Sequence, residues 1–207
     1  MMQGRKKYQR RQWIKDQYYY FGSKYKLSNI MTDTLTLDCY TGPNANWNIT
    51  LVPYQNMYLN ASFGETPYRP IYAKAGQAYE MEGVFTDMNN TRIYIYGASR
   101  LQALGGAAIY EENEIVGYNG LAFLYIGAND FSKAKKLRHL KLGTDDASYS
   151  NTRFNSLVLS NSPILETLDI KNCNGLAGEL DLSNNNNLRI LEAEGTNYSL
   201  VTLPVSS

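Results

Sequence analysis

Short apolar triplets recur along the C-terminal third of the chain, and Asn, Gly and Ser lie between them. They are LKL at 140–142, LVL at 157–159, LDI at 168–170, LDL at 180–182, LEA at 191–193 and VTL at 201–203. Alternate triplets begin about 23 residues apart, as from Leu157 to Leu180 and from Leu168 to Leu191. A fixed period of this length predicts stacked turns that each hold two short strands.

The spacing inside each turn resembles that of leucine-rich repeats. Leu165, Leu168, Ile170 and Cys173 fit the phrase L-x-x-L-x-L-x-x-N/C, in which Cys173 has a structural role at the bend. Because strand side chains alternate, we expect the leucines to face inward and residues between them, such as Asp169 and Glu192, to face outward. The predicted solenoid core consists of Leu140, Leu142, Leu157, Leu159, Leu165, Leu168, Ile170, Cys173, Leu180, Leu182, Leu188, Leu191 and Leu203.

One step of the repeat is longer than the others. From Leu140 to Leu168 it spans 28 residues, which exceeds the period by five. We therefore expect residues 143–153 to form a longer loop at one edge of the solenoid.

In the middle of the chain, apolar and polar residues alternate instead. Between 32 and 97 this alternation gives six candidate strands, DTLTLDCY, WNITLV, NMYLNASF, RPIYA, AYEMEGVF and TRIYIYG, separated by Gly, Pro and Asn. Such spacing predicts a small antiparallel sandwich or barrel. The stretch after 97 is less regular, and Glu111, Glu112 and Glu114 beside Asn113 indicate an exposed loop.

Near the N-terminus the spacing is helical. Apolar residues at Tyr8, Trp13, Ile14, Tyr18 and Phe21 predict a helix within 5–25 that ends around Gly22. The expected fold is thus mainly β, with a short N-terminal helix, a small antiparallel β-sandwich-like module and a leucine-rich-repeat-like β-solenoid of about 23 residues per turn. The expected divisions are 1–30, 31–97 and 98–207, and the solenoid ends after VTL without a polar capping repeat.

Charged residues are distributed unevenly, with most of the excess positive charge near the N-terminus. The 207 residues have a net charge of +1, but residues 1–26 carry +7 and the rest carry −6. The basic helix face is either solvated, which is favoured, or a docking element for an acidic or phosphate-bearing partner. The candidate docking residues are Arg5, Lys6, Lys7, Arg10, Arg11 and Trp13. The sequence gives no indication of a membrane span or a signal peptide.

The chemistry-bearing residues do not form a recognisable site. His139 is the only histidine, and Cys39 and Cys173 lie far apart without a nearby ligand, so we expect neither a metal nor another cofactor. Two groups of acids lie close together in predicted loops: Asp145 with Asp146, and Glu111, Glu112 and Glu114. Adjacent acids point apart, so we do not expect them to form the facing pair of carboxylates that glycoside hydrolysis needs. No P-loop, GxSxG or HExxH motif occurs, and we expect a protein that is not an enzyme.

A basic cluster after residue 130 has two interpretations. It comprises Lys133, Lys135, Lys136, Arg138 and Lys141. A subunit contact or a soluble rim is favoured over a nucleic-acid patch, because no base-reading module accompanies these charges.

Several longer phrases occur in a distinctive order. They are YQRRQWIKDQYYYFGSKY, TLVPYQNMYLNASFG, RIYIYGASRLQALG, LYIGANDFSKAKKLRHLKLG and LETLDIKNCNGLAGELDLS. From about Tyr8 to Pro204 the chain resembles leucine-rich-repeat-containing virion structural proteins, of the tail-associated kind, from bacteriophages of gut bacteria. That resemblance implies a virion protein made in the bacterial cytoplasm, and a region that belongs to the later part of a longer polypeptide. We therefore expect a fragment, a processed piece or one component of a larger particle.

Two hypotheses of function follow. In the first, the chain is a structural subunit whose partners are other virion proteins and copies of itself, and whose open solenoid edge favours association. In the second, the solenoid is an adhesin that binds a host-surface glycan or protein. Its candidate binding face is Tyr149, Asn151, Arg153 and Asn155, together with Asn172 and Asn174.

Overall fold

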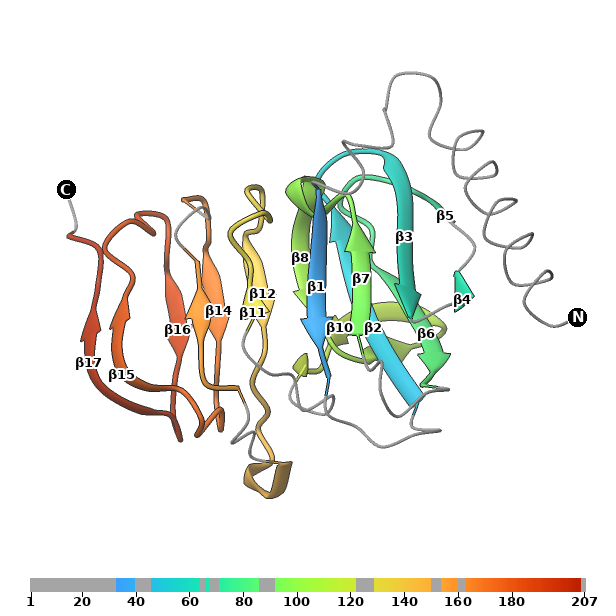
Figure 1. Ribbon diagram of the computed structural model, residues 1–207. Coiled ribbons are helices and arrows are strands. Elements are labelled where there is room, and N and C mark those ends of the chain that lie inside the picture. Colours follow the sequence, from blue (N-terminus) through green and yellow to red (C-terminus); the bar gives the residue numbers. More distant parts are fainter. Residues whose placement is uncertain are drawn as a thin grey trace, which may run out of the picture.

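The computed structural model describes residues 33–39, 46–63, 66–67, 71–85, 92–121, 129–149, 154–159 and 163–205. Within these ranges the protein is mainly β, which confirms the expected class (Figure 1). The expected N-terminal helix, with its candidate docking residues Arg5, Lys6, Lys7, Arg10, Arg11 and Trp13, lies outside the described residues.

One sheet of the β-module is five-stranded and antiparallel. It contains β1 (Thr34–Asp38), β7 (Arg92–Tyr96), β3 (Met57–Phe63) and β4 (Thr66–Pro67) in that order, and β5 (Ile71–Ala73) also pairs with β3. The alternation of β1 determines its faces: Leu35 and Leu37 are buried, whereas Thr34 and Thr36, which alternate with them, are only half-buried. Ile93 and Ile95 on β7 are paired with these leucines and are buried on the same side of the sheet.

The second sheet has six strands and changes direction in its middle. Its order is β16 (Ile190–Glu192), β14 (Thr167–Asp169), β12 (His139–Lys141), β8 (Leu101–Gly105), β2 (Asn46–Pro53) and β6 (Tyr79–Val84). The strands β8, β12, β14 and β16 are parallel, whereas β2 pairs antiparallel with both β8 and β6.

The strand β8 therefore joins the two halves of the molecule. It follows the expected boundary at residue 97, after the 3-10 turn η1 (Ala98–Arg100), yet it pairs with β2 on one side and β12 on the other. Leu51, Leu104 and Leu140 belong to one continuous buried core. The module and the parallel ladder consequently share one sheet and one core.

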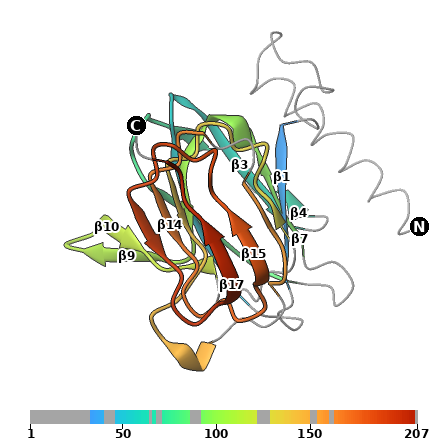
Figure 2. The ribbon, with the colours of Figure 1, turned by 90° about the vertical axis from the view of Figure 1, so that its left-hand side faces the viewer.

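A second layer accompanies the parallel ladder. It contains two parallel pairs, β11 (Asn129–Asp130) with β13 (Leu157–Val158), and β15 (Ala177–Asp181) with β17 (Asn197–Thr202). Figure 2 looks onto the end of the molecule at which β15 and β17 lie. Leu159, Leu180 and Leu182 from these segments join the same core as Leu140 and Leu168. The two ladders thus enclose a common row of leucines.

Register within the ladders follows the apolar triplets. Leu140 is paired with Leu168, and Leu168 with Leu191, at sequence offsets of 28 and 23. In the other layer Leu180 is paired with Val201. The longer first step contains the 3-10 turn η3 (Ala147–Tyr149), which projects below the ladders in Figure 1. That these ladders form a leucine-rich-repeat-like solenoid remains a prediction.

Burial of the predicted core residues decreases toward the end of the ladders. Leu140, Leu142, Leu159, Leu165, Leu168, Ile170, Cys173, Leu180 and Leu182 are buried. Leu157, Leu188 and Leu191 are half-buried against this core. The expectation is wrong for Leu203, which is 55% exposed. It follows the edge strand β17, beyond which no further described strand packs.

The irregular stretch after residue 97 contains a hairpin that the sequence analysis did not predict. The strands β9 (Ala108–Glu111) and β10 (Glu114–Tyr118) form a separate two-stranded sheet that projects from the body in Figure 2. Glu112 and Asn113 at the tip both have positive φ, as a two-residue type I′ turn requires. The three glutamates are exposed, as expected, but they occupy a hairpin tip rather than an irregular loop.

Candidate functional site

The open edge of the two ladders is the feature that most needs an explanation. Among the described residues, β16 pairs only with β14, and β17 pairs only with β15. The apolar residues of this last turn are less covered than those one turn earlier: Leu191 and Val201 are half-buried, whereas Leu168 and Leu180 are buried. Ile190 and Leu200 are 52% and 50% exposed. Unpaired strand edges of this kind favour addition of another strand.

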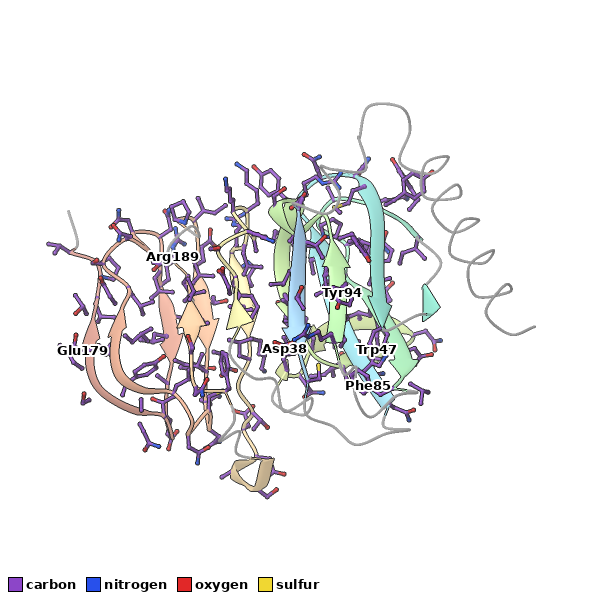
Figure 3. All side chains as sticks on the ribbon, viewed as in Figure 1. Asp38, Trp47, Phe85, Tyr94, Glu179 and Arg189 are labelled. Carbon is purple, nitrogen blue, oxygen red and sulfur yellow. The ribbon has the colours of Figure 1, made fainter. Side chains whose placement is uncertain are left out.

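A column of alternating charge leads to this edge. The guanidinium of Arg138 binds the Glu166 carboxylate, with a distance of 2.9 Å from Nε to Oε1, and this hydrogen bond lowers the pKa of Glu166. The backbone N–H of Arg189 then donates to the carbonyl of Glu166, at 2.8 Å. The Arg189 side chain is exposed and makes no ion pair with another described residue (Figure 3). The column therefore ends at Arg189, whose positive charge also lowers the pKa of Glu166.

A second charged column crosses the same three strands. Lys141, Asp169 and Glu192 are in register, and the Lys141 Nζ lies 3.8 Å from Asp169 Oδ2. Lys171 binds Asp145 and also Glu192, with 3.2 Å between Nζ and Oε2. These contacts connect successive turns of the ladder, and they leave Glu192 and its neighbour Glu194 exposed at the edge.

Asp169 departs from the expectation of an outward, solvated side chain. It is only 7% exposed, and its Oδ1 accepts a hydrogen bond of 3.0 Å from the backbone N–H of Lys171. Its Oδ2 accepts no hydrogen bond from any described residue. Burial raises the pKa of Asp169 against the opposing effects of the Lys171 amide and the two lysines. Strand alternation directs the side chain away from the leucine core, but the bend at Gly143 covers it, because a Cβ at Gly143 would lie 2.4 Å from Asp169 Oδ1.

Bends between strands are held by asparagine and by close backbone contact. The amide of Asn172 donates to the carbonyl of Thr144 at 2.8 Å, and that of Asn197 donates to the carbonyl of Asn174. Cys173 is buried at the same bend, and burial raises the pKa of its thiol to about 12. A neutral, buried thiol is consistent with the structural role expected for Cys173.

The candidate binding face is only partly described. Asn151 and Arg153 lie outside the described residues, Tyr149 ends the η3 turn, and Asn155 is exposed. Asn172 uses its amide to bond a neighbouring bend, and Asn174 is half-buried. That these residues form one binding face stays a prediction.

The basic cluster is dispersed among different partners. The Lys133 ammonium donates to the carbonyl of Thr34, Lys136 lies over the ring of Tyr54, and Arg138 binds Glu166. Only Lys135 lacks such a contact within the part of the chain that the structure describes. Four of the five side chains, with Lys141 near Asp169 as the fourth, thus contact different groups of the chain itself.

The remaining candidates for chemistry occupy separate positions. The His139 Nδ1 lies 3.0 Å from Thr167 Oγ1, and burial lowers the pKa of the imidazole. Asp146 accepts a 2.9 Å hydrogen bond from the backbone N–H of Ser148, and its hydrogen bonds with Ser148 lower the pKa of its carboxyl. The described residues contain no group of three His, Cys, Asp or Glu side chains suited to a metal ion. No helix in the same ranges is long and apolar enough to cross a membrane.

Two surface features escaped the sequence analysis. The outward face of the five-stranded sheet carries Tyr58, Tyr72, Tyr94 and Tyr96, with Tyr72 57% exposed. Tyr58 and Tyr72 meet edge to face at 5.3 Å between ring centroids. The alternation in RIYIYG was a usable signal for this face, since it directs Tyr94 and Tyr96 to the side of the sheet away from the buried Ile93 and Ile95.

The second feature is the anchor of the projecting hairpin. Glu80 on β6 accepts hydrogen bonds from the Ala108 backbone at 2.9 Å, the Tyr110 hydroxyl at 2.8 Å and the Asn48 amide at 3.2 Å. Burial alone would raise the pKa of Glu80, but these three bonds outweigh it and lower the pKa. Their partners are distant in sequence, so no local pattern could indicate them.

Comparisons of this chain with protein-family models, with curated proteins and with solved structures return no match.

Proposed function

We propose that this chain is a non-enzymatic structural protein of a bacteriophage virion, of the tail or baseplate type, and that it assembles through its β-module and the open edge of its ladders. The observation that carries the proposal is the pair of edge strands β16 and β17, whose outer sides pair with no strand among the described residues and whose inward residues Leu191 and Val201 are half-buried. Completing such an edge with another subunit covers apolar surface and satisfies backbone groups.

We interpret the two parallel ladders as turns of a leucine-rich-repeat-like solenoid. The offset of 23 residues between Leu168 and Leu191 supports this interpretation, as does the burial of Leu165, Ile170 and Cys173. A solenoid turn buries its apolar row only against the next turn, so a terminal turn is a natural contact surface.

The order of phrases that resembles virion proteins of gut bacteriophages is the second support. On this proposal the protein is made in the cytoplasm of the host bacterium and functions in the particle. Its partners are other virion proteins and copies of itself.

A host-surface adhesin is the second candidate function. The tyrosine face formed by Tyr58, Tyr72, Tyr94 and Tyr96 favours it, because aromatic rings beside hydroxyl groups suit carbohydrate. An ion pair of 2.6 Å between Arg92 and Asp38 borders these rings. The exposed Asn155, in the set that the sequence first indicated, is a further contact candidate.

The test is the protein's presence in particles. Antibodies against the chain are applied to density-gradient fractions of a lysate from the producing bacterium, with a host cytoplasmic enzyme as the control. We expect the chain to sediment with intact particles and to be released only when they dissociate. Chain that is abundant in the lysate but stays with the host enzyme would contradict the proposal.

Binding to cells separates the two candidates. The purified chain and a variant with Tyr72→Ala and Tyr94→Ala are incubated with host cells stripped or not stripped of surface polysaccharide. Binding that requires both the polysaccharide and the tyrosines would favour the adhesin.

A further inference from the structure

We propose that the N-terminal segment 5–25 of this chain covers the tyrosine face, the outward side of the five-stranded sheet that carries Tyr58, Tyr72, Tyr94 and Tyr96. The contact is intramolecular, and it is made by the apolar side of the helix that the sequence predicts for this segment. It goes beyond the proposed function, since neither assembly through the ladder edge nor glycan binding requires it.

The tyrosine face is a continuous aromatic surface. Tyr58 on β3 lies directly opposite Tyr72 on β5, and their rings meet edge to face. Tyr94 and Tyr96 lie on β7, the next strand on the other side of β3. Tyr72 is 57% exposed, and the other three side chains are half-buried. Aromatic side chains gathered in this way mark a surface that packs against another element.

The same face carries no net charge. The charged residues within β1, β3, β5 and β7 are Asp38 and Arg92, and these two form an ion pair with each other. They lie at the end of β1 opposite Thr34, beyond the tyrosines. The face therefore suits an apolar occupant rather than a charged one.

The chain that precedes the described residues enters this sheet beside the tyrosines. Thr34 begins β1, which is an edge strand, and its register partner on β7 is Tyr96. Asp33 is fixed just before it, because its carboxylate accepts hydrogen bonds from the Ser99 backbone N–H at 2.7 Å and from the Ser99 hydroxyl at 2.8 Å. The segment 5–25 is therefore tethered at the Tyr96 end of the face.

The tether is long enough for the segment to reach every tyrosine. Residues 23–32 connect the predicted helix to Asp33, and ten extended residues span roughly 30 Å. The face is narrower, since β5 lies three strand spacings from β1, or about 14 Å. The segment can thus cover the face of its own sheet, and no second copy is needed.

The apolar pattern of the segment matches the face in size. Ile14, Tyr18 and Phe21 follow one another at i, i+4 and i+7, which places them on one side of a helix. At 1.5 Å per residue this stripe is about 10 Å long, similar to the two strand spacings of about 10 Å between β7 and β5. Gln9 and Gln12 fall on the opposite side, so packing the stripe on the tyrosines buries apolar surface of both and leaves polar groups in water.

The contact changes what the β-module presents to a partner. While the segment lies on the tyrosines, the surface there is the polar side of the segment, and a glycan does not reach the rings. Glycan binding at this face would therefore require the segment to leave it.

Cysteine cross-linking of the full 207-residue chain tests the contact. Tyr72→Cys is combined with Tyr18→Cys or Phe21→Cys from the stripe, or with Gln12→Cys from the opposite side as the control, and a short bismaleimide is added. We expect the two stripe pairs to give linked monomer about fivefold faster than the control pair, because opposite sides of a helix point apart.

The native cysteines do not interfere with this experiment. Cys39 and Cys173 are both buried, and burial raises the pKa of each thiol to about 12. Both therefore stay protonated and unreactive toward the linker.

Hydrogen exchange tests the same contact without added cysteines. Tyr72→Asp places a charge on the face and should accelerate exchange of amides 14–21 about tenfold, because it releases the segment. Val116→Asp on the hairpin is the matched control, since Val116 is 54% exposed against 57% for Tyr72, and it should leave these amides unchanged. Both positions are more than half exposed, so we expect both variants to keep the wild-type circular dichroism.

Each outcome decides for or against the contact. Equal linking of the stripe and control pairs, or exchange at 14–21 that does not respond to Tyr72→Asp, would overturn it. Linked dimers in place of linked monomers would also overturn it, since they would place the segment on a second copy. None of these results depends on whether the chain is found in particles, so the virion proposal is tested separately.

Discussion

At the scale of single residues, the bend beside Asp169 shows how a solvent-facing position becomes buried. Strand alternation directs Asp169 away from the leucines, and that much was predictable from the triplet LDI. The covering backbone of Gly143 comes from the preceding turn, 26 positions earlier, and no local pattern encodes it. The direction of a side chain can therefore be read from the sequence here, but its exposure cannot.

The raised pKa of Asp169 predicts a pH dependence of stability. The folded protein retains the proton at pH values where the unfolded chain, with the ordinary pKa of 3.8, has released it. The free energy of unfolding contributed by this group should therefore fall as pH rises from about 3.8 through the raised folded value, and stay level above it. Asp169→Asn should remove this slope. Urea unfolding of both proteins at a series of pH values measures it, and parallel curves would contradict the prediction.

Gly143 is a position at which one added methyl group should be costly. An added Cβ would lie 2.2 Å from the backbone nitrogen of Lys171, an impossible contact without a shift of the chain. Gly143→Ala should therefore lower the free energy of unfolding by about 2 kcal/mol or more. Gly117→Ala is the control, because its nearest atom is 3.8 Å away, and it should change stability by less than about 1 kcal/mol. Chemical denaturation compares the two, and equal losses would show that the bends are not close-packed.

At the scale of elements, alternation identified strands better than it identified their partners. Each of the six ranges between 32 and 97 contains a strand, as in WNITLV for β2 and RIYIY for β7. The pairing of β8 with β12 joins residues such as Ala103 and His139, and such distant contacts leave no period in the sequence. The hairpin at 108–118 was missed because its tip, Glu112 and Asn113, lacks the glycine that usually marks such turns.

That unusual tip gives an element-level prediction. Glu112 adopts φ of 47°, a conformation that glutamate disfavours and that asparagine and glycine adopt readily. Replacing Glu112-Asn113 by Asn-Gly should slow hydrogen exchange of the β9 and β10 amides by about threefold to tenfold. Amides of β14 serve as the internal reference and should not change. Faster exchange in the hairpin would mean that the tip is not a type I′ turn.

Inside the ladder, Leu168 is a position where a charge should not be tolerated. It is fully buried between Leu140 and Leu191, so Leu168→Asp places a charge in the shared core and should cost more than about 4 kcal/mol, enough to unfold at least the C-terminal turns. Val116→Asp, at an exposed hairpin position, is the matched control and should be close to neutral. Thermal melting by circular dichroism compares them, and an unchanged melting temperature for Leu168→Asp would refute this register.

At the scale of the whole molecule, the β-module and the ladders should unfold together. Leu104 on β8 is fully buried and lies in a core that contains residues of both halves. Leu104→Ala should lower the free energy of unfolding by about 2–5 kcal/mol and accelerate exchange of the slowest amides in β2 and in β14 by the same factor. If only one of these strands responds, the two halves are separate cooperative units. The sequence analysis placed a boundary at residue 97 because the spacing of apolar residues changes there. It did not anticipate this coupling, since the sheet continues across that boundary.

The dual pairing of β8 also has a mechanical consequence. A force applied at the β16 end is transmitted across the sheet strand by strand, and it enters the β-module through hydrogen bonds on both sides of β8 rather than through a single covalent tether. Bending must therefore stretch or slide several backbone bonds at once. The described part of the protein should therefore resist bending as one stiff unit.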